Sequence, residues 1–486
     1  MVEQETDKPR VKDISFLNTI KTVAIIGPSQ KRGFMFVKSH ADNFKGKAVY
    51  AVHPKLKEIP GFENVKVYPS LLDIPDQIDY VYISVPNSVI LGVIDDCVKA
   101  GVKLASVFTS EFSDSGTIEG LELEKEMLRR ANDKLRMIGP NGLGLYYPKL
   151  GLGWRTLFQK SFGKSSLRVG VVGQSGGLTN ALIYTATYLG LEISKAFSFG
   201  NGADLGFVDL LHYLINDPET DIILSYLEGI KEGHGKKLKW VLNQNKNDKP
   251  IVIVRGGQTD AGSKATLTHT ASISGENKIW KGLFNQFNII EVESLEQLLH
   301  ITYLIENYGL FEMENVAVLS GSGGYGVILT DLVEKVGIKV PPFSSNIQEK
   351  LNLLFGVAGT SPKNPLDPSA MVFNTDMMYK IIDLALSDTG IDGIIVDLPS
   401  FIFLQDPDPR KDPNFESKML EVLTLGHKHN KPLIANIIRA NYPEEKERVS
   451  KKLRDKKVPV FGDPFEFIPL LPKISGYTKN RKSKKI

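Results

Sequence analysis

The chain has 486 residues and a formal net charge of +3, with 42% apolar and 24% charged residues, a composition typical of a soluble globular protein of about three domains. No apolar run approaches the roughly 20 residues that span a bilayer, and residues 1–10 lack the apolar core of a secretory signal, so we expect no membrane association. The single cysteine, Cys97, excludes an internal disulfide and a thiolate metal cluster and fits a reducing cytoplasm.

Five of the last eight residues are Lys or Arg, which predicts a basic, disordered tail over 476–486. Because no basic surface with interleaved aromatic residues accompanies the tail, we expect no nucleic-acid partner.

Apolar runs typical of buried strands alternate with helical patterns along almost the whole chain, which predicts parallel α/β layers. The runs at 22–26, 48–52, 80–85 and 104–108, with a helical pattern at 119–131, form a nucleotide-binding type of unit that ends near residue 150. We therefore expect a first domain over 1–150.

The remainder reads as an internal duplication. The segment 169–177 (VGVVGQSGG) matches 316–324 (VAVLSGSGG), and 249–255 (KPIVIVR) resembles 431–437 (KPLIANI). These matches predict two copies of one α/β domain, over 160–310 and 311–475.

Two glycine-rich turns follow predicted strands and precede predicted helices, where backbone amides can receive phosphate oxygens. The first holds Gly27, Ser29 and Gly33. It differs from the dinucleotide fingerprint because Ser29 replaces the second glycine, so a nicotinamide cofactor is disfavoured. Lys55, after the second strand, is a candidate phosphate partner. A plain tight turn and a solvated lysine are the structural alternatives.

The second turn holds Gln174, Ser175, Gly176 and Gly177. Two free glycine amides at the positive end of a helix dipole predict a cradle for a phosphoryl group. The residues also fit the Gly-x-Ser-x-Gly string of hydrolase nucleophiles, but no Asp and His follow in a convincing context for that alternative.

The segment 256–272 leaves the carboxyl end of a predicted strand, is rich in small residues and carries His269. A histidine on a mobile loop is suited to carrying a group between two places. The corresponding segment of the second copy, 439–445, is charged and ordinary, which favours a function over a flexible loop with an incidental histidine.

Glu228 ends another strand at the same edge and could hold one imidazole nitrogen, or else cap the next element. The remaining histidines lack a third ligand, so we expect no metal site.

In this order and spacing the motifs resemble the alpha subunit of NDP-forming acyl-CoA synthetases, the ADP-forming relatives of succinyl-CoA synthetase. The resemblance also rests on the run 139–141 (GPN), which ends at Asn141, and on the run 364–367 (NPLD). It implies three Rossmann- or flavodoxin-like parallel-sheet domains, of which the first binds coenzyme A and the next two are duplicated ligase domains. The implied CoA-binding residues are Gly27, Ser29, Gly33, Lys55, Val85, Pro86, Glu111 and Asn141.

The resemblance also implies the chemistry. Phosphate converts an acyl-CoA to an acyl phosphate, His269 takes the phosphoryl group, and ADP is converted to ATP. Glu228 would orient the phosphohistidine, and Ser175, Gly176 and Gly177 would hold the phosphate. The chain departs from the common pattern at Gly142, where many relatives have cysteine, and at 34–36 and 151–164.

No ATP-grasp region is recognisable in the sequence, so the resemblance implies a separate ATP-grasp beta subunit in an α2β2 assembly. That subunit would supply the site for ATP or ADP and Mg²⁺, and the substrate would be a small organic acid. Two alternatives remain open: a non-catalytic CoA-binding or sensing protein on the same scaffold, and a dehydrogenase.

Overall fold

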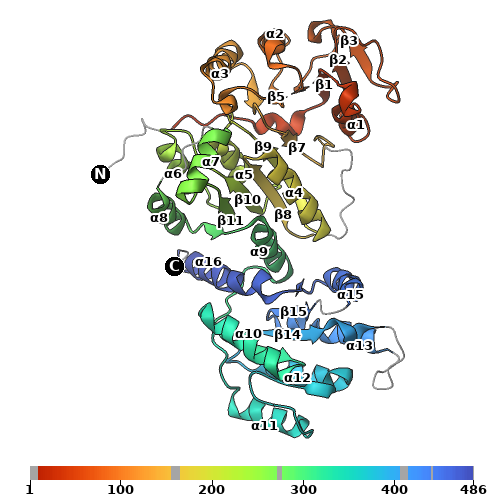
Figure 1. Cartoon of the computed structure of the whole chain (residues 1–486), viewed down its shortest axis with the longest axis vertical. Helices are drawn as coiled ribbons and strands as arrows, with labels where there is room; N and C mark the ends of the chain where they lie inside the picture. Colours follow the sequence, from red (N-terminus) through yellow and green to blue (C-terminus); the bar gives the residue numbers. More distant parts are fainter. Residues whose placement is uncertain (1–8, 155–164, 271–275, 405–413, 439–441, 485–486) are drawn as a thin grey trace. The chain divides into compact units, whose positions relative to one another are not determined.

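The computed structural model describes residues 9–154, 165–270, 276–404, 414–438 and 442–484 (Figure 1). Contacts within the chain divide it into two compact units, 1–295 and 296–486. The first unit holds two parallel-dominated sheets and the second unit holds one. The α/β class and the three sheets confirm the fold class expected from the alternation of apolar runs and helical patterns.

The first sheet has six parallel strands in the order β3-β2-β1-β4-β5-β6, which is the Rossmann order. Its strands are fully buried over most of their length because helices cover parallel sheets on both faces. The predicted strands at 22–26 and 48–52 are confirmed, whereas β4 and β5 each end before the last predicted residues. The elements are β1 (Thr22–Ile26), α1 (Met35–Ala41), β2 (Ala48–Val52), β3 (Lys66–Tyr68), β4 (Tyr80–Ile83), α2 (Ile90–Lys99), β5 (Leu104–Val107), η6 (Ser113–Ser115), α3 (Ile118–Ala131) and β6 (Arg136–Ile138).

The second sheet has the order β12-β11-β10-β8-β9-β7, so β8 to β12 follow the flavodoxin order. Strand β7 pairs antiparallel with β9, although its residues fall within the predicted first domain. The two sheets therefore belong to one compact unit. The elements are β7 (Gly144–Tyr146), β8 (Arg168–Gly173), α4 (Gly176–Tyr188), β9 (Glu192–Ser198), α5 (Phe207–Asn216), β10 (Ile222–Leu227), α6 (Gly235–Asn243), β11 (Ile251–Arg255), α7 (Asp260–Thr270), α8 (Asn277–Phe287) and β12 (Ile290–Val292).

The third sheet, β13-β14-β15-β16, repeats the order β8-β10-β11-β12 of the second. Helix α9 packs with this sheet, since the Tyr303 hydroxyl donates to the Val458 carbonyl oxygen at 3.1 Å. The two compact units divide between residues 295 and 296, so nearly all of α9 lies in the second unit, whereas the predicted domain boundary is at 310. The elements are α9 (Leu295–Tyr308), β13 (Val316–Ser320), α10 (Gly323–Lys335), α11 (Ser345–Leu354), α12 (Thr375–Ser387), β14 (Gly393–Pro399), α13 (Phe415–Val422), α14 (Leu425–His429), β15 (Leu433–Ile438), α15 (Pro443–Asp455), β16 (Val460–Phe461) and α16 (Leu471–Ser483).

The two copies share a buried lysine contact that the matching Lys-Pro sequences supply. Lys249 Nζ donates to the carbonyl oxygens of Leu214 and Asp217 at 2.9 and 2.6 Å, at the end of α5. Lys431 Nζ donates in the same way to Leu386 and Asp388 at 2.8 and 2.6 Å, at the end of α12. A cation at the negative end of a helix dipole stabilises that end, so Lys249 ties the start of β11 to α5, and Lys431 ties the start of β15 to α12.

The predicted disordered tail is wrong over 476–483, because these residues continue helix α16. Leu471, Ile474 and Tyr477 form a buried apolar face on this helix. Its cations are paired: Lys482 Nζ lies 2.7 Å from Glu312 Oε1, and Lys479 pairs with Glu314. Burial of the apolar face and pairing of the cations with carboxylates stabilise the helix, although its high lysine content suggested disorder.

A buried carboxyl group lies at the carboxyl edge of the third sheet. Asp397 is 1% exposed and accepts hydrogen bonds from Ser320 Oγ at 2.9 Å and from Asn436 Nδ2 at 2.7 Å. Burial raises the pKa of Asp397 to about 6, although both hydrogen bonds oppose that rise.

This raised pKa predicts a pH dependence of stability. The unfolded carboxyl has a pKa of about 3.9, so between about pH 4 and 6 the folded state holds a proton that the unfolded state lacks. Its contribution, roughly 2–3 kcal/mol, is present at acid pH and is lost as the pH rises through about 6. Calorimetric unfolding should therefore show Asp397→Asn gaining stability relative to the wild type between pH 5 and 7.5. Asp376→Asn, an exposed control, should show no such trend, and a pH-independent difference for Asp397→Asn would contradict the prediction.

Candidate functional site

The order of the second sheet reverses between β8 and β10, and ligands of open α/β sheets bind at the carboxyl ends of such strands. Ser175 follows β8 there, and Glu228 follows β10. Gln174 connects the segments that follow β8 and β10. Its backbone N–H donates to the Tyr226 carbonyl oxygen at 3.1 Å, and its side-chain Oε1 accepts from the Glu228 N–H at 3.0 Å. The structure thus brings the predicted phosphate cradle and the predicted carboxylate to one edge.

Ser175 is the N-cap of helix α4. Its hydroxyl oxygen accepts from the Leu178 N–H at 3.4 Å, and its carbonyl oxygen accepts from Thr179. Gly176 and Gly177 begin the helix, where backbone N–H groups have no intrahelical partner and the dipole is positive. A Cβ at Gly177 would meet nothing within 4 Å, so the space beside this glycine is open, whereas a Cβ at Gly176 would come within 3.2 Å of the Leu143 side chain. This geometry suits an anion, whereas the capping hydroxyl does not resemble a nucleophile paired with a base.

Glu228 is a buried carboxylate, 5% exposed, whose Oε1 accepts a hydrogen bond from the Tyr226 hydroxyl at 3.1 Å. Burial and the adjacent Glu228 charge raise the pKa of Tyr226, which keeps its hydroxyl a donor. The next helix, α6, begins only at Gly235 and has no side-chain cap, so Glu228 does not cap it. In the register of the second copy, Asp397 stands where Tyr226 does, and Pro399 stands two residues on in the place of Glu228.

The segment with His269 is a helix over 260–270 rather than a loop, which corrects the expectation of a mobile loop for those residues. Thr259 starts it: its Oγ1 accepts from the Gly262 N–H at 3.1 Å, and Asp260 places a negative charge at the positive helix end. Helix α7 lies beside η6 of the first sheet. The side chain of His269 and residues 271–275 lie outside the part of the chain that the structure describes.

The order of the first sheet reverses between β1 and β4, and the turn after β1 lies at that point. Gly27 has φ 79°, and a Cβ there would come within 2.6 Å of the Ser84 carbonyl oxygen and of Val85, so only glycine fits. The Ser29 carbonyl oxygen accepts from the N–H groups of Arg32 and Phe34 and closes the turn, in which Gly33 has φ 57°.

The other predicted CoA-binding residues follow the neighbouring strands. Thr109, which sequence reasoning missed, joins two of their segments: its Oγ1 donates to the Val85 carbonyl oxygen at 2.7 Å, and its carbonyl oxygen accepts from the Asn141 N–H at 2.8 Å. Pro86 follows Val85 directly. Glu111 has φ 69°, and its Oε2 accepts from Asn87 Nδ2 at 2.9 Å.

Lys55 is separate from this set of contacts. Its side chain is exposed, and its backbone N–H donates to His53 Nδ1 at 3.1 Å. The loop after β2 therefore presents a solvated ammonium group at the carboxyl end of that strand, where Coulomb attraction would reach a phosphate.

A cavity of about 460 Å³ brings residues from both sheets together. Asn141 of the first sheet meets the Ser175, Gly176 and Gly177 cradle there, whereas Glu228 and Lys55 do not line it. Arg32, Phe108 and Asn180 also line the cavity and were missed, because a single arginine, phenylalanine or asparagine carries no pattern in the sequence. The full lining is Arg32, Phe108, Ser110, Asn141, Gly142, Leu143, Gln174, Ser175, Gly176, Gly177, Asn180 and Gly200.

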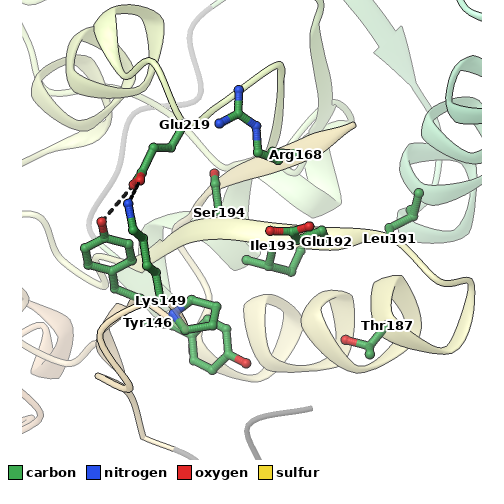
Figure 2. Close-up of a pocket in the computed structure, with 11 residues that line it drawn as sticks. Tyr146, Lys149, Arg168, Thr187, Leu191, Glu192, Ile193, Ser194 and Glu219 are labelled. Carbon is green, nitrogen blue, oxygen red and sulfur yellow. Dashed lines mark hydrogen bonds and ion pairs between the residues drawn. The ribbon is translucent and has the colours of Figure 1, made fainter. Parts of the chain in front are cut away.

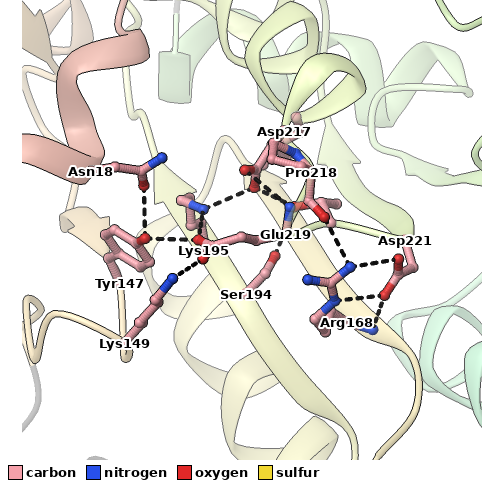
Figure 3. Close-up of polar contacts among 12 residues, drawn as sticks. Asn18, Tyr147, Lys149, Arg168, Ser194, Lys195, Asp217, Pro218, Glu219 and Asp221 are labelled. Carbon is pink, nitrogen blue, oxygen red and sulfur yellow. Dashed lines mark hydrogen bonds and ion pairs between the residues drawn. The ribbon is translucent and has the colours of Figure 1, made fainter.

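A second cavity of about 440 Å³ lies at the amino ends of β8 and β9, the opposite edge of the second sheet (Figure 2). Most of the charged groups at this edge are paired, whereas Glu192, which also lines the cavity, is exposed. Figure 3 shows the fully buried Lys195 between Asp217 and Glu219, at 2.9 and 2.7 Å, and Arg168 beside Asp221 at 2.9 Å. Burial works against ionisation of Glu219, but the hydrogen bonds from Lys149 and Lys195 hold its pKa at about 2. Because the described cations of this edge are neutralised by carboxylates, the edge stabilises the fold and offers no unpaired positive charge to an anion.

Among the described residues, no three or more His, Cys, Asp or Glu side chains are arranged to hold a metal ion. The same part of the chain has no helix with both the length and the apolar character that a membrane crossing requires.

Comparison with known families assigns both sheets of the first unit. Residues 21–148 match the CoA binding domain, and residues 167–305 match the succinyl-CoA ligase-like flavodoxin domain. A solved structure of acetyl-coenzyme A synthetase 1 from Candidatus Korarchaeum cryptofilum is similar with a TM-score of 0.80 and 28% identity, covering 97% of this chain and 100% of that one. Another structure of that enzyme is a complex with phosphate and ADP.

Similar curated proteins include long and short forms. The chain is 35% identical over 73% of its length to acetate–CoA ligase (ADP-forming) of Methanocaldococcus jannaschii, but spans only 49% of that protein. It is 29% identical to acetate–CoA ligase (ADP-forming) I of Archaeoglobus fulgidus and spans 63% of it. It is 30% identical to subunit alpha of acetate–CoA ligase (ADP-forming) II of Pyrococcus furiosus, with 77% of this chain and 79% of that subunit aligned. The chain therefore belongs to the family of ADP-forming acyl-CoA ligases.

Proposed function

We propose that the chain is the alpha subunit of an ADP-forming acyl-CoA ligase, which interconverts an acid, CoA and ATP with an acyl-CoA, ADP and phosphate. The observation that carries this proposal is the cavity in which Asn141 of the first sheet faces the N-terminus of α4. A thioester bound along the first sheet and a phosphate bound at α4 would meet there.

The carboxyl edge of the first sheet suits coenzyme A. The turn of Gly27, Ser29 and Gly33 exposes backbone amides at the strand-order reversal, and Gly27 allows close approach of the chain. Lys55 adds a cation for a phosphate group. The proposed CoA-binding residues are Gly27, Ser29, Gly33, Lys55, Val85, Pro86, Glu111 and Asn141.

In the direction of ATP synthesis the proposed chemistry has three substitutions. A phosphate oxygen attacks the thioester carbonyl carbon, the C–S bond breaks, and the CoA thiolate leaves an acyl phosphate. An imidazole nitrogen of His269 then attacks phosphorus, and the carboxylate of the acid leaves. Finally a terminal phosphate oxygen of ADP attacks the phosphorus of the phosphohistidine, the P–N bond breaks, and ATP and the free imidazole of His269 are formed.

The chain's own groups would assist two of these steps. The amides of Gly176 and Gly177, with the helix cap Ser175, hold the phosphate oxygens and stabilise their negative charge. Glu228 would accept a hydrogen bond from the other imidazole nitrogen of His269, which orients the ring and stabilises its positive charge once phosphorylated.

We infer that ADP or ATP and Mg²⁺ bind to a separate ATP-grasp beta subunit, in an α2β2 assembly. The aligned region covers 96% of subunit alpha of acetate–CoA ligase (ADP-forming) I of Pyrococcus furiosus, whereas it covers 49% of the Methanocaldococcus relative. The acid is proposed to be acetate or another short organic acid.

His269 should carry the phosphoryl group. With ATP, Mg²⁺ and the beta partner, the wild type should gain an acid-labile, base-stable phosphate, detected by labelling and mass spectrometry. His269→Ala should lose both the label and turnover while its affinity for CoA stays the same, and the control His427→Ala should keep all three. Label retained by His269→Ala would reject the phosphohistidine, and CoA binding without label in the wild type would favour the non-catalytic alternative.

Glu228→Gln preserves size but removes the charge that would pair with a charged imidazole. Loss of a charge-assisted hydrogen bond of about 1.5–3 kcal/mol should lower the phosphoenzyme yield roughly 10- to 150-fold. The CoA dissociation constant, measured by calorimetry, should change little. Glu232→Gln, an exposed neighbour, is the matched control. A normal phosphoenzyme level in Glu228→Gln would reassign Glu228 to a structural role.

The 486-residue chain alone should bind CoA with roughly micromolar affinity yet show no acid-dependent ATP hydrolysis, because phosphoryl transfer to ADP needs metal and positive charge around its phosphates. Added ATP-grasp subunit should restore acyl-CoA synthesis and co-elute with the chain in size-exclusion chromatography. ATP-dependent acyl-CoA synthesis by the pure chain would contradict the proposal that the nucleotide site lies on a separate subunit.

A further inference from the structure

Trp154, in one of the segments that depart from the common family pattern, contacts a residue that lines the cavity at the start of α4. Its indole Nε1 donates to Asn180 Oδ1 at 3.1 Å, and Asn180 lines the cavity. Trp154 is 3% exposed and its ring lies 5.5 Å from that of Tyr146, so the indole is fixed by its surroundings.

This contact determines which end of the amide faces Trp154. An indole N–H only donates, so its partner must be the carbonyl oxygen of Asn180, and the –NH₂ group is then turned away from Trp154. Asn180 is four residues after Gly176, which places both on the same face of α4. The –NH₂ group of Asn180 thus lies on the side of the amide away from Trp154, at a residue that lines the cavity together with Gly176 and Gly177.

Arg32 supplies positive charge to the same cavity. It is the charged residue of the lining, and its guanidinium carbon lies 4.9 Å from the centre of the Phe108 ring, which also lines the cavity. Within the described part of the chain, Arg32 makes no ion pair with a carboxylate, in contrast to Lys195 and Arg168 at the opposite sheet edge. An aromatic face holds a guanidinium without neutralising it, so its charge stays available to an anion.

We propose that Asn180 and Arg32 bind the negatively charged oxygen atoms of the substrate phosphate, and that Trp154 is the positioning residue that fixes the Asn180 amide. This inference rests on the proposed function, which places phosphate at the start of α4. Asn180 and Arg32 add an amide and a cation to the Gly176 and Gly177 N–H groups. A dianion there is held by donors from both sheets, which keeps the phosphate beside the thioester.

Binding of inorganic phosphate to the full chain, measured by calorimetry without turnover, tests this assignment. Asn180→Asp replaces donors with a repelling carboxylate, and Arg32→Gln removes the charge, so each should weaken phosphate binding at least tenfold. Trp154→Phe should weaken it about three- to fivefold. Ala181→Asp, which puts the same carboxylate on the next, exposed residue of α4 outside the cavity lining, should change it less than twofold.

The positioning role of Trp154 has its own readout. If the indole acts through Asn180, Trp154→Phe should cause no further loss of phosphate affinity in an Asn180→Ala background. An equal loss in both backgrounds would show a merely structural role for Trp154 and overturn that part of the proposal.

Titration of the same variants with CoA separates free phosphate from the phosphate groups of CoA. CoA affinity should stay within twofold in the Asn180 and Trp154 variants, and Arg32→Gln should lower phosphate affinity more than CoA affinity. Weaker CoA binding with normal phosphate binding in Arg32→Gln would place the guanidinium on CoA and overturn its assignment. Unchanged phosphate affinity in Asn180→Asp and Arg32→Gln, together with normal labelling of His269, would overturn this inference but leave the proposed function intact. Absence of labelling in the wild type would instead reject the proposed function itself.

Discussion

The site depends on the reversal of strand order between β8 and β10. Adjacent parallel strands whose connections leave in opposite directions keep their carboxyl ends uncovered, and this is where Gln174 and Glu228 lie. The 3.0 Å hydrogen bond from the Glu228 N–H to Gln174 Oε1 then holds the end of β10 against the start of α4. A helix N-terminus and a buried carboxylate are thereby held next to each other by the Gln174 side chain and by the ends of two adjacent strands.

The two edges of the second sheet differ in whether their positively charged groups are paired with carboxylates. At the amino edge, Lys195 and Arg168 are each paired with carboxylates, and the buried lysine would be costly without them. At the carboxyl edge, helix amides are open and Arg32 rests on an aromatic ring. Positive charge that is compensated internally stabilises the fold, whereas positive charge left without an internal partner is what an anionic substrate would need.

The duplicated domain shows which interactions belong to the scaffold. Both copies keep the strand order, and in both a lysine bonds the end of a helix, Lys249 at α5 and Lys431 at α12. They differ at the sheet edge, where Asp397 and Pro399 replace Tyr226 and Glu228. Divergence of edge residues on an unchanged backbone allows one copy to acquire chemistry that the other lacks.

The sequence by itself determined the parallel α/β layers, the duplication and the grouping of Ser175 and Glu228 at one edge, because buried strands need unbroken apolar runs and parallel strands present their ends together. Only the tertiary structure decided that α9 belongs to the second unit, that residues 260–270 and 476–483 are helical, and that Arg32 and Asn180 share one cavity. The cavity, like the hydrogen bond from Trp154 to Asn180, joins residues that are distant in the chain. Such contacts produce no periodic pattern in the sequence from which they could be predicted.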